Sequence, residues 1–333
     1  MAKPLVAIVG RPNVGKSTFF NRVAGRRIAI VEDTPGVTRD RLYADAEWLG
    51  RTFTMIDTGG IDPDATEVIP TQMRLQAQLA VDIAQVILFF VDAKQGLVSG
   101  DEEIAEMLRR SGKPVITVVN KADNAEMEQS AYDFYTLALG PVFAVSSAQG
   151  LGLGDLLDEV ISHHGEADTE DNSDTVKVAI VGRPNAGKSS LVNRIIGEER
   201  TIVSDVAGTT RDAVDVPFER AGQKFVLIDT AGIRKKARIE DKSIERYSVI
   251  RAFAAVRRAD VVVVMIDATQ GISEQDVKIA GFVHEEGKPC VIAVNKCDAV
   301  EKDTHTTNAY DKRITSDLAF MRYARTVYIS ALS

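Results

Sequence analysis

The sequence has two cysteines, one tryptophan and no long hydrophobic run among its 333 residues. Cys290 and Cys297 form neither a C-x-x-C motif nor a cluster with histidines, which argues against a disulfide framework or a zinc site and favours buried thiols in a reducing compartment. The longest apolar segments, 86–91 and 261–266, have the length of strands and fall short of the roughly 18 residues that a membrane span needs. The first residues already form a strand-like segment, so we expect no signal peptide, no membrane contact and a cytoplasmic protein.

The sequence also has no excess of basic residues over acidic ones. The sequence holds 40 Lys and Arg against 48 Asp and Glu, for a net charge of −8, which argues against a protein that coats nucleic acid through summed phosphate contacts. Any contact with RNA must therefore be local. One candidate is the segment 231–258, where nine basic residues stand against three acidic ones. The alternative interpretation of this segment, a solvated helix face, stays open.

Two copies of one eight-residue motif are the strongest signal that is present. Residues 10–17 read GRPNVGKS and residues 182–189 read GRPNAGKS. Each copy follows a short apolar run and precedes a helix-like segment, as a phosphate-binding loop requires. Backbone N–H groups of such a loop hold phosphate oxygens, together with the positive end of the following helix. Lys16 and Lys188 are expected to reach the β- and γ-phosphates, and Ser17 and Ser189 to bind Mg²⁺. The residues predicted to line the two loops are Gly10, Arg11, Pro12, Asn13, Val14, Gly15, Lys16 and Ser17, and Gly182, Arg183, Pro184, Asn185, Ala186, Gly187, Lys188 and Ser189.

Further motifs repeat in the same order, which indicates a tandem duplication of one nucleotide-binding domain. The repeats are PGVTRD (35–40) with AGTTRD (207–212), DTGGI (57–61) with DTAGI (229–233), NKAD (120–123) with NKCD (295–298), and SSA (146–148) with ISA (329–331). The acidic, polar stretch 166–175 is typical of a linker. We therefore predict a first domain at 1–165 and a second at 176–333. The second domain would end before its last helix, since two residues follow its last motif, and we expect the natural protein to be longer.

Apolar strands alternate with amphipathic helices in the first domain. This pattern predicts an α/β fold with a mostly parallel sheet and helices on both faces. A hairpin pattern around Leu49 and Gly50 predicts one antiparallel edge strand. The same architecture is expected in the second domain because the motifs keep their order. The expected strands are 5–9, 41–48, 52–57, 86–91, 115–119 and 142–145, and the expected helices are 18–24, 72–84, 101–110 and 153–163.

The NKxD motif predicts which base each domain binds. An Asp carboxylate accepts two hydrogen bonds from guanine N1–H and N2–H₂, whereas adenine offers no such pair of donors. Asp123 and Asp298 are therefore expected to select guanine. The other residues expected around the base are Asn120 and Asn295, which would tie this loop to the phosphate loop, Lys121 and Lys296, which would pack along the base, Ala122, Cys297, Ser147 and Ser330, and Ala148 and Ala331, whose backbone N–H groups would contact guanine O6.

Two further positions in each domain are typical of a Mg²⁺ and γ-phosphate site. Asp57 and Asp229 follow a strand and precede glycine-rich turns, which is the placement of an acid that holds Mg²⁺ through water. Thr38 and Thr210 are the candidates for a second side-chain ligand that binds while the γ-phosphate is present. Hydrolysis would release both loops, as in the order–disorder switch of small GTPases. The residues predicted to act in hydrolysis are Lys16, Thr38, Gly60, Lys188, Thr210 and Gly232, and the neighbours expected to line the nucleotide are Thr58, Gly59, Ile61, Thr230, Ala231 and Ile233.

One departure from the common GTPase pattern affects the expected mechanism. Many regulatory GTPases place a water-positioning Gln after the glycine of this motif, but here the residues are Ile61 and Ile233, which cannot hydrogen-bond water. Asn13 and Asn185 offer a substitute, because their amide oxygens could hold K⁺ beside the β/γ bridge, where charge develops. The alternative is that these asparagines only brace the loop backbone.

Taken together, these motifs resemble the bacterial EngA/Der family of double GTPases. The resemblance covers the whole chain through GRPNVGKST, PGVTRD, DTGGI and NKAD, and then GRPNAGKSS, GTTRD, DTAGI and NKCD. It implies two tandem P-loop GTPase domains in a cytosolic protein that binds the ribosome and assists maturation of the large subunit. It also implies K⁺-stimulated GTP hydrolysis with Mg²⁺ as cofactor, and a C-terminal KH-like domain contacting RNA that this sequence lacks. We expect a monomer with GTP and GDP as ligands.

Two other functions are weighed against this interpretation. A metabolic P-loop kinase or ATPase is disfavoured by Asp123 and Asp298, and by the lack of a base placed to activate an acceptor. A GTP-regulated scaffold in RNA modification or in a cell-envelope process is disfavoured because the sequence has no basic amphipathic anchor and no zinc pattern. Binding to ribosomes separates the scaffold from the ribosome-assembly GTPase.

Overall fold

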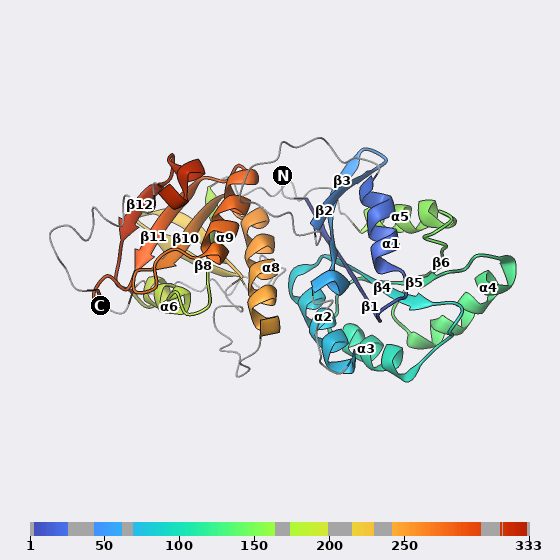
Figure 1. Cartoon of the computed structure of the whole chain (residues 1–333). Coiled ribbons are helices and arrows are strands. Elements are labelled where there is room, and N and C mark those ends of the chain that lie inside the picture. The colour runs from blue at the N-terminus through green and yellow to red at the C-terminus, as the bar shows by residue number, and fades with distance from the viewer. Residues whose placement is uncertain are drawn as a thin grey trace. The chain divides into compact units, whose positions relative to one another are not determined.

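The computed structural model describes residues 3–25, 43–61, 69–163, 174–198, 215–229, 242–300, 314 and 316–331. These residues form two compact units, the first within 3–163 and the second within 174–331. Each unit contains one six-stranded sheet (Figure 1). Across the described ranges, no helix combines the length and the apolar character that crossing a membrane requires.

The first unit has the strand order β2-β3-β1-β4-β5-β6. All neighbouring pairs are parallel except β2 with β3, which form an antiparallel hairpin. Leu49 and Gly50 form its turn with φ values of 48° and 77°, and two positive φ angles define the turn that matches the twist of hairpin strands. The strands are β1 (Leu5–Gly10), β2 (Tyr43–Trp48), β3 (Arg51–Asp57), β4 (Val86–Asp92), β5 (Val115–Asn120) and β6 (Val142–Ala144).

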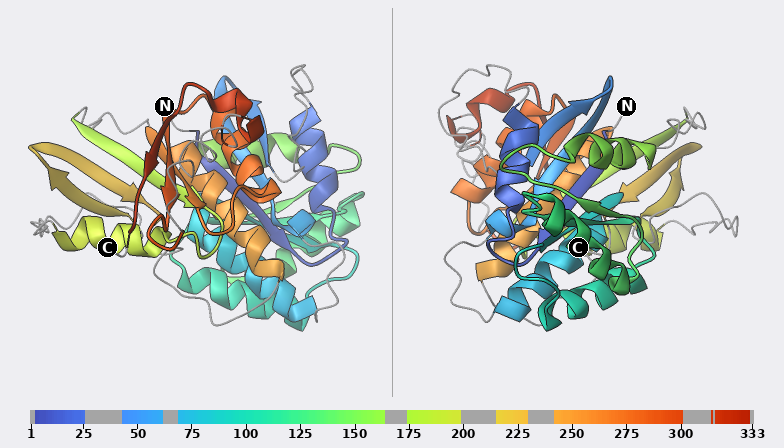
Figure 2. Two further views of the ribbon diagram at one scale, coloured as in Figure 1. Left: turned by 60° about the vertical axis from the view of Figure 1, so that its left-hand side comes forward. Right: turned by 90° about the vertical axis from the view of Figure 1, so that its right-hand side faces the viewer.

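Helices cover both faces of this sheet, as Figure 2 shows. The residues of β1, β4 and β5 are buried throughout, because a parallel sheet between two helical layers exposes neither face. One face packs on α1 and α5, where the rings of Phe19 and Phe90 lie 5.1 Å apart. The helices are α1 (Lys16–Ala24), η2 (Thr58–Ile61), α2 (Ile69–Ile83), α3 (Ser99–Arg110), α4 (Ala125–Ser130), η3 (Ala131–Leu137) and α5 (Leu153–Ser162).

The second unit repeats the topology of the first. Its strand order, β12-β11-β10-β7-β9-β8, is the first order read from the other edge, and β8 with β9 is again the antiparallel pair. Its strands are β7 (Thr175–Gly182), β8 (Val216–Arg220), β9 (Gln223–Ile228), β10 (Val261–Asp267), β11 (Cys290–Asn295) and β12 (Arg325–Tyr328). Its helices are α6 (Lys188–Glu198), α8 (Lys242–Arg258), α9 (Glu274–Glu285) and η4 (Ala319–Met321).

The predicted architecture is confirmed: two α/β units, each with a mostly parallel sheet and one antiparallel edge strand. Individual bounds differ by a few residues. Thr175, which we expected in the linker, is the first residue of β7 and pairs with Lys224 of β9. The helix expected at 101–110 begins earlier, at Ser99. The short helices α4 and η3 were not predicted, because their residues show no clear apolar periodicity.

Candidate functional site

The two GRPN-x-GKS motifs form the loops between β1 and α1 and between β7 and α6. Gly15 and Gly187 both have φ of 96°, a conformation that glycine adopts without steric cost. A Cβ added to Gly15 would lie 2.2 Å from Nδ2 of Asn120, and one added to Gly187 would lie 2.0 Å from Nδ2 of Asn295. These glycines are therefore required both by the backbone and by the approach of a second loop.

The lysine of each loop lies inside the loop itself. Lys16 Nζ donates to the carbonyl oxygens of Gly10, at 2.6 Å, and Arg11, at 2.7 Å. Lys188 Nζ makes the same two bonds in the second unit, at 2.7 and 2.6 Å. Burial lowers the pKa of each lysine to about 8. Each ammonium is thus held next to the loop N–H groups that would bind phosphate.

Two of the expected Mg²⁺-site residues of the first unit, Ser17 and Asp57, lie together. Ser17 Oγ donates to Asp57 Oδ2 at 2.8 Å, and the backbone N–H of Gly59 donates to Asp57 Oδ1 at 2.9 Å. A hydroxyl and a carboxylate are the oxygen ligands that Mg²⁺ uses beside water and phosphate. The described residues hold no group of three His, Cys, Asp or Glu that could bind a metal.

The second unit has its hydroxyl and carboxylate at matching places in the fold. Ser189 lies in the first turn of α6, and Asp229 directly follows β9 with φ of 57°. The backbone N–H of Asp229 donates to Asp215 Oδ1 at 3.1 Å. Some predicted residues lie outside the described ones: Thr38, Thr210, Thr230, Ala231, Gly232 and Ile233. Gly60 and Ile61 lie in η2, where the structure describes the backbone.

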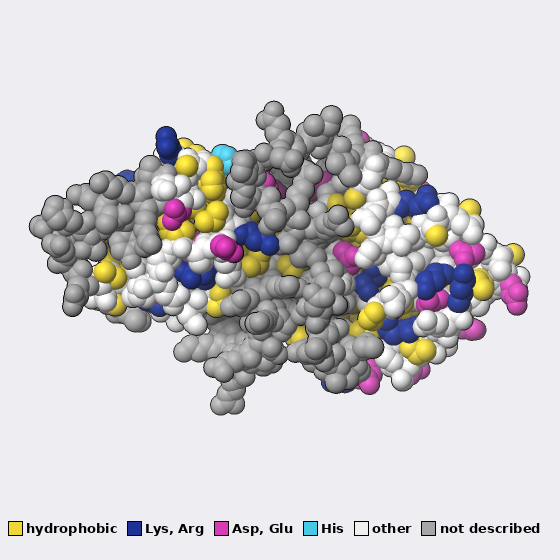
Figure 3. Space-filling model, in the orientation of Figure 1, with side chains coloured by type: hydrophobic (Ala, Val, Ile, Leu, Met, Phe, Trp, Pro, Cys, Tyr) yellow, Lys and Arg dark blue, Asp and Glu magenta, His cyan; other side chains and the backbone are white. Residues whose placement is uncertain are grey.

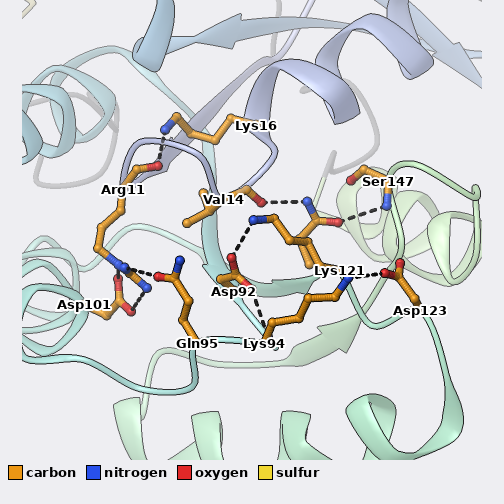
Figure 4. Close-up of polar contacts among 11 residues, drawn as sticks. Arg11, Val14, Lys16, Asp92, Lys94, Gln95, Asp101, Lys121, Asp123 and Ser147 are labelled. Atoms are coloured by element: carbon orange, nitrogen blue, oxygen red, sulfur yellow. Dashed lines mark hydrogen bonds and ion pairs between the residues drawn. The ribbon is translucent and has the colours of Figure 1, made fainter.

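A buried asparagine joins the phosphate loop to the base loops in each unit. Asn120 Nδ2 donates to the Val14 carbonyl at 2.7 Å, while its Oδ1 accepts from the backbone N–H of Ser147 at 2.9 Å. Asn295 makes the same bonds to Ala186 and Ala331, at 2.8 and 2.9 Å. The expected tie between the NKxD loop and the phosphate loop is therefore present as a hydrogen bond, and it extends to a third loop (Figure 4).

The hydrogen bonds shift the expected alignment of SSA with ISA by one position. Ser146 Oγ donates to Asp123 Oδ1 and Ser330 Oγ donates to Asp298 Oδ1, both at 2.7 Å. Ser146 is thus the counterpart of Ser330. The counterpart of Ala331 is then Ser147 and not Ala148, so the expected pairing of Ala148 with Ala331 is wrong. Matching the two alanines misled the alignment, because the contacts are made by a hydroxyl and a backbone N–H.

A carboxylate that we did not predict holds the lysine of each NKxD motif. Lys121 Nζ bonds Asp92 Oδ2, and Lys296 Nζ bonds Asp267 Oδ2, both at 2.6 Å. Both aspartates are almost fully buried at the ends of β4 and β10. Burial by itself raises the pKa of Asp267, but hydrogen bonds from Lys296 and Thr269 hold that pKa below its usual value. These aspartates could have been found in the sequence, because the segment VDAKQG at 91–96 is repeated as IDATQG at 266–271.

The arginine of each phosphate loop is held by an acid in the first turn of a helix distant in sequence, α3 in the first unit and α9 in the second. Arg11 binds Asp101 through Nε, at 2.8 Å, and a terminal nitrogen, at 3.1 Å. Arg183 Nε lies 2.8 Å from Asp276 Oδ2. The sequence had placed both arginines at the nucleotide, but in the structure their guanidinium groups bind these acids. Arg11 therefore anchors its loop to α3 (Figure 4), and Arg183 anchors its loop to α9.

Comparison with known proteins adds the following similarities. The family described as "50S ribosome-binding GTPase" matches residues 5–121 and again residues 177–296. The "GTPase Der" of Alkaliphilus metalliredigens is 58% identical over 334 residues, covering 100% of this chain and 76% of the relative. The "GTPase Der" of Clostridium perfringens is 54% identical with the same coverage. Among solved structures, the FeoB G-domain of Methanococcus jannaschii covers 49% of this chain and 98% of its own, with 20% identity and a TM-score of 0.37.

Proposed function

The chain belongs to the Der family of GTPases, and from this premise we propose that each of its two units binds GTP with Mg²⁺ and hydrolyses it to control contact with the large ribosomal subunit. One observation carries the proposal for the nucleotide. In both units a buried asparagine fixes the NKxD loop to the phosphate loop. The loop that carries Asp123 or Asp298 is thereby fixed to the loop that carries the phosphate-binding lysine, as one nucleotide bound by both loops requires.

We assign the phosphate chemistry to the loop residues. Lys16 and Lys188 would bind the β- and γ-phosphates once their ammonium groups leave the loop carbonyls. The backbone N–H groups of Gly60 and Gly232 would donate to the γ-phosphate, with Thr38 and Thr210 closing over it. Bound Mg²⁺ neutralises charge on the phosphate oxygens; Ser17 with Asp57, and Ser189 with Asp229, would hold it. The contact between Ser17 and Asp57 supports this assignment.

The cation at the β/γ bridge remains to be assigned. The guanidinium groups of Arg11 and Arg183 are bound to carboxylates, and Ile61 and Ile233 lack a polar side chain. We assign the role to K⁺ held by Asn13 and Asn185. Their side chains are exposed on the loops, with φ of 65° and 63°, and an amide oxygen is a ligand for an alkali ion. Equal GTP turnover in KCl and NaCl would contradict this assignment, whereas at least a several-fold loss in NaCl is expected.

The ribosomal partner is proposed from family membership and from the charge distribution. Basic and acidic side chains are interspersed on the face of the first unit drawn in Figure 3, which suits a local contact better than broad RNA coating. The described part of the predicted basic segment is α8, whose last two residues, Arg257 and Arg258, are paired with Glu286 and Asp215. We propose that this monomeric, cytoplasmic protein assists assembly of the large subunit.

The proposal is tested by sedimenting the chain with large ribosomal subunits on a sucrose gradient, once with GDP and once with a non-hydrolysable GTP analogue. Co-migration with the analogue alone is expected. Small subunits serve as the control and should not carry the chain. Failure to co-migrate in either nucleotide state would contradict the proposal that this chain contacts the large subunit under nucleotide control.

A further inference from the structure

The carboxylate of Asp123 already carries two donors from the protein. Ser146 Oγ donates to its Oδ1 and Lys94 Nζ donates to its Oδ2, both at 2.7 Å (Figure 4). These hydrogen bonds, the one from Lys94 first, hold the pKa of Asp123 below its usual value. Lys94 comes from the loop after β4, where its backbone N–H donates to Asp92 Oδ1 at 2.9 Å. The same aspartate therefore orients this loop and the NKxD lysine.

The second unit has the same backbone arrangement with a different side chain. Thr269 stands where the first unit has Lys94, and its N–H donates to Asp267 Oδ1 at the same distance of 2.9 Å. Its hydroxyl turns back to that oxygen, at 2.6 Å. The serine contact is equally matched, because Ser330 donates to Asp298 Oδ1 at 2.7 Å. On this common frame, the residue after the buried aspartate and alanine carries an ammonium group in the first unit and a hydroxyl in the second.

We propose that Lys94 competes with guanine for Asp123 and so weakens the binding of guanine nucleotides at the first site. This inference rests on the proposed function, in which guanine gives one N–H to each oxygen of the carboxylate. An ammonium group is a stronger donor than a neutral N–H, so the base must displace Lys94 from Oδ2 or share that oxygen with it. Thr269 carries no charge, and its hydroxyl donates to Asp267.

The expected effect is modest because the pair is in contact with water. The side chains of Lys94 and Asp123 are 48% and 28% exposed, and exposed ion pairs are weak. We therefore expect removal of Lys94 to tighten GDP binding at the first site by about 2- to 5-fold. The gain should shrink as salt is raised, because screening already weakens an exposed pair.

The test uses the whole chain with the second site silenced. Asp298→Asn replaces the carboxylate that accepts from guanine with an amide. The NH₂ of this amide would face the N2–H₂ group of guanine, and because two donors cannot hydrogen-bond, GDP binding at the second site is lost. In this background, titration calorimetry measures GDP affinity at the first site in three proteins: the one that keeps Lys94, the variant Lys94→Thr, and the charge-conserving variant Lys94→Arg. Tighter binding by Lys94→Thr and unchanged binding by Lys94→Arg are expected. Unchanged or weaker binding by Lys94→Thr would overturn the inference.

The reciprocal exchange is the matched control. Thr269→Lys is made with the first site silenced by Asp123→Asn, and GDP should then bind the second site about 2- to 5-fold more weakly. A purely structural role for Lys94 would change the melting temperature without nucleotide and leave GDP affinity unchanged. If the unaltered chain binds ADP as well as GDP, the proposed function itself is wrong. If GDP is preferred but both exchanges are silent, only the role of Lys94 is wrong.

Discussion

The two units share one polar frame and differ in a few side chains placed on it. In both, an asparagine joins three loops, a buried aspartate holds the NKxD lysine, and a loop lysine binds its own loop carbonyls. The differences lie beside this frame. Lys94 of the first unit corresponds to Thr269 of the second, and Val98 corresponds to Ser273. Groups that would define the nucleotide chemistry are thus the same, while groups that adjust affinity and stability differ.

The arginine anchors show how one such difference acts. Val98 offers no side-chain cap to α3, so Asp101 is bound by two nitrogens of Arg11. In the second unit Ser273 forms a capping box with Asp276, and the same carboxylate oxygen accepts from Ser273 and lies next to Arg183. Asp101 therefore depends more on its arginine than Asp276 does.

The largest expected effect separates these two anchors. Arg11→Ala would leave the fully buried Asp101 carboxylate without its cation, which costs about 3–5 kcal/mol in the unfolding free energy of the first unit. Arg183→Ala should cost about half as much, because Ser273 still binds Asp276. Urea denaturation of each variant measures both values. Equal losses in the two units would contradict the proposed difference between the anchors.

Truncation of the shared asparagine should affect both units alike. Asn120→Ala leaves the Val14 carbonyl and the Ser147 N–H unpaired, and Asn295→Ala does the same to Ala186 and Ala331. Each loss should lower the unfolding free energy by about 2–3 kcal/mol. Nucleotide affinity at the altered unit should fall as well, because the base loop loses its attachment. A fall in affinity at the unaltered unit would show that this contact is not local.

The loop lysines should give both units the same dependence on pH. Burial lowers the pKa of Lys16 and Lys188 from 10.5 to about 8. Between these values the unfolded chain binds protons that the folded lysines have lost, so the unfolding free energy rises with pH, by up to about 1.4 kcal/mol per pH unit for each lysine. The variants Lys16→Met and Lys188→Met should each remove one such contribution. Stability curves measured from pH 7 to pH 10 that keep the same slope in either variant would contradict the burial effect.

The smallest expected effect concerns the helix caps. Ser273→Val removes the capping box of α9 and should cost about 1 kcal/mol. Val98→Ser supplies the missing hydroxyl to α3 and should stabilise the first unit by about 0.5 kcal/mol. Thermal unfolding of the two variants measures these opposite shifts. If Val98→Ser destabilised the first unit, Asp101 would be unable to accept from a capping serine and pair with Arg11 at the same time.

The parts of the fold that could be predicted from sequence are those that depend on short, contiguous patterns of residues. The phosphate loops, the apolar strands and the tandem repeat each occupy a short stretch of residues. The contacts missed by sequence analysis join distant residues: Arg11 with Asp101, Lys121 with Asp92, and Lys94 with Asp123. Each depends on parallel strands ending at one edge of the sheet, where loops far apart in sequence meet. Comparing the two halves position by position could have indicated Asp92, because Asp267 stands at the same offset as the NKxD motif.

The central claim is that each unit holds one guanine-nucleotide site chosen by its own NKxD aspartate. It is tested most directly by counting bound nucleotides in Asp123→Asn and Asp298→Asn. Xanthine carries a carbonyl oxygen where guanine carries its N2 amine, so an asparagine NH₂ can donate to it. We expect the unaltered chain to bind two equivalents of GDP, and each variant to bind one equivalent of GDP and one of xanthosine diphosphate. A single substitution that abolished both GDP sites, or that changed neither, would contradict the account.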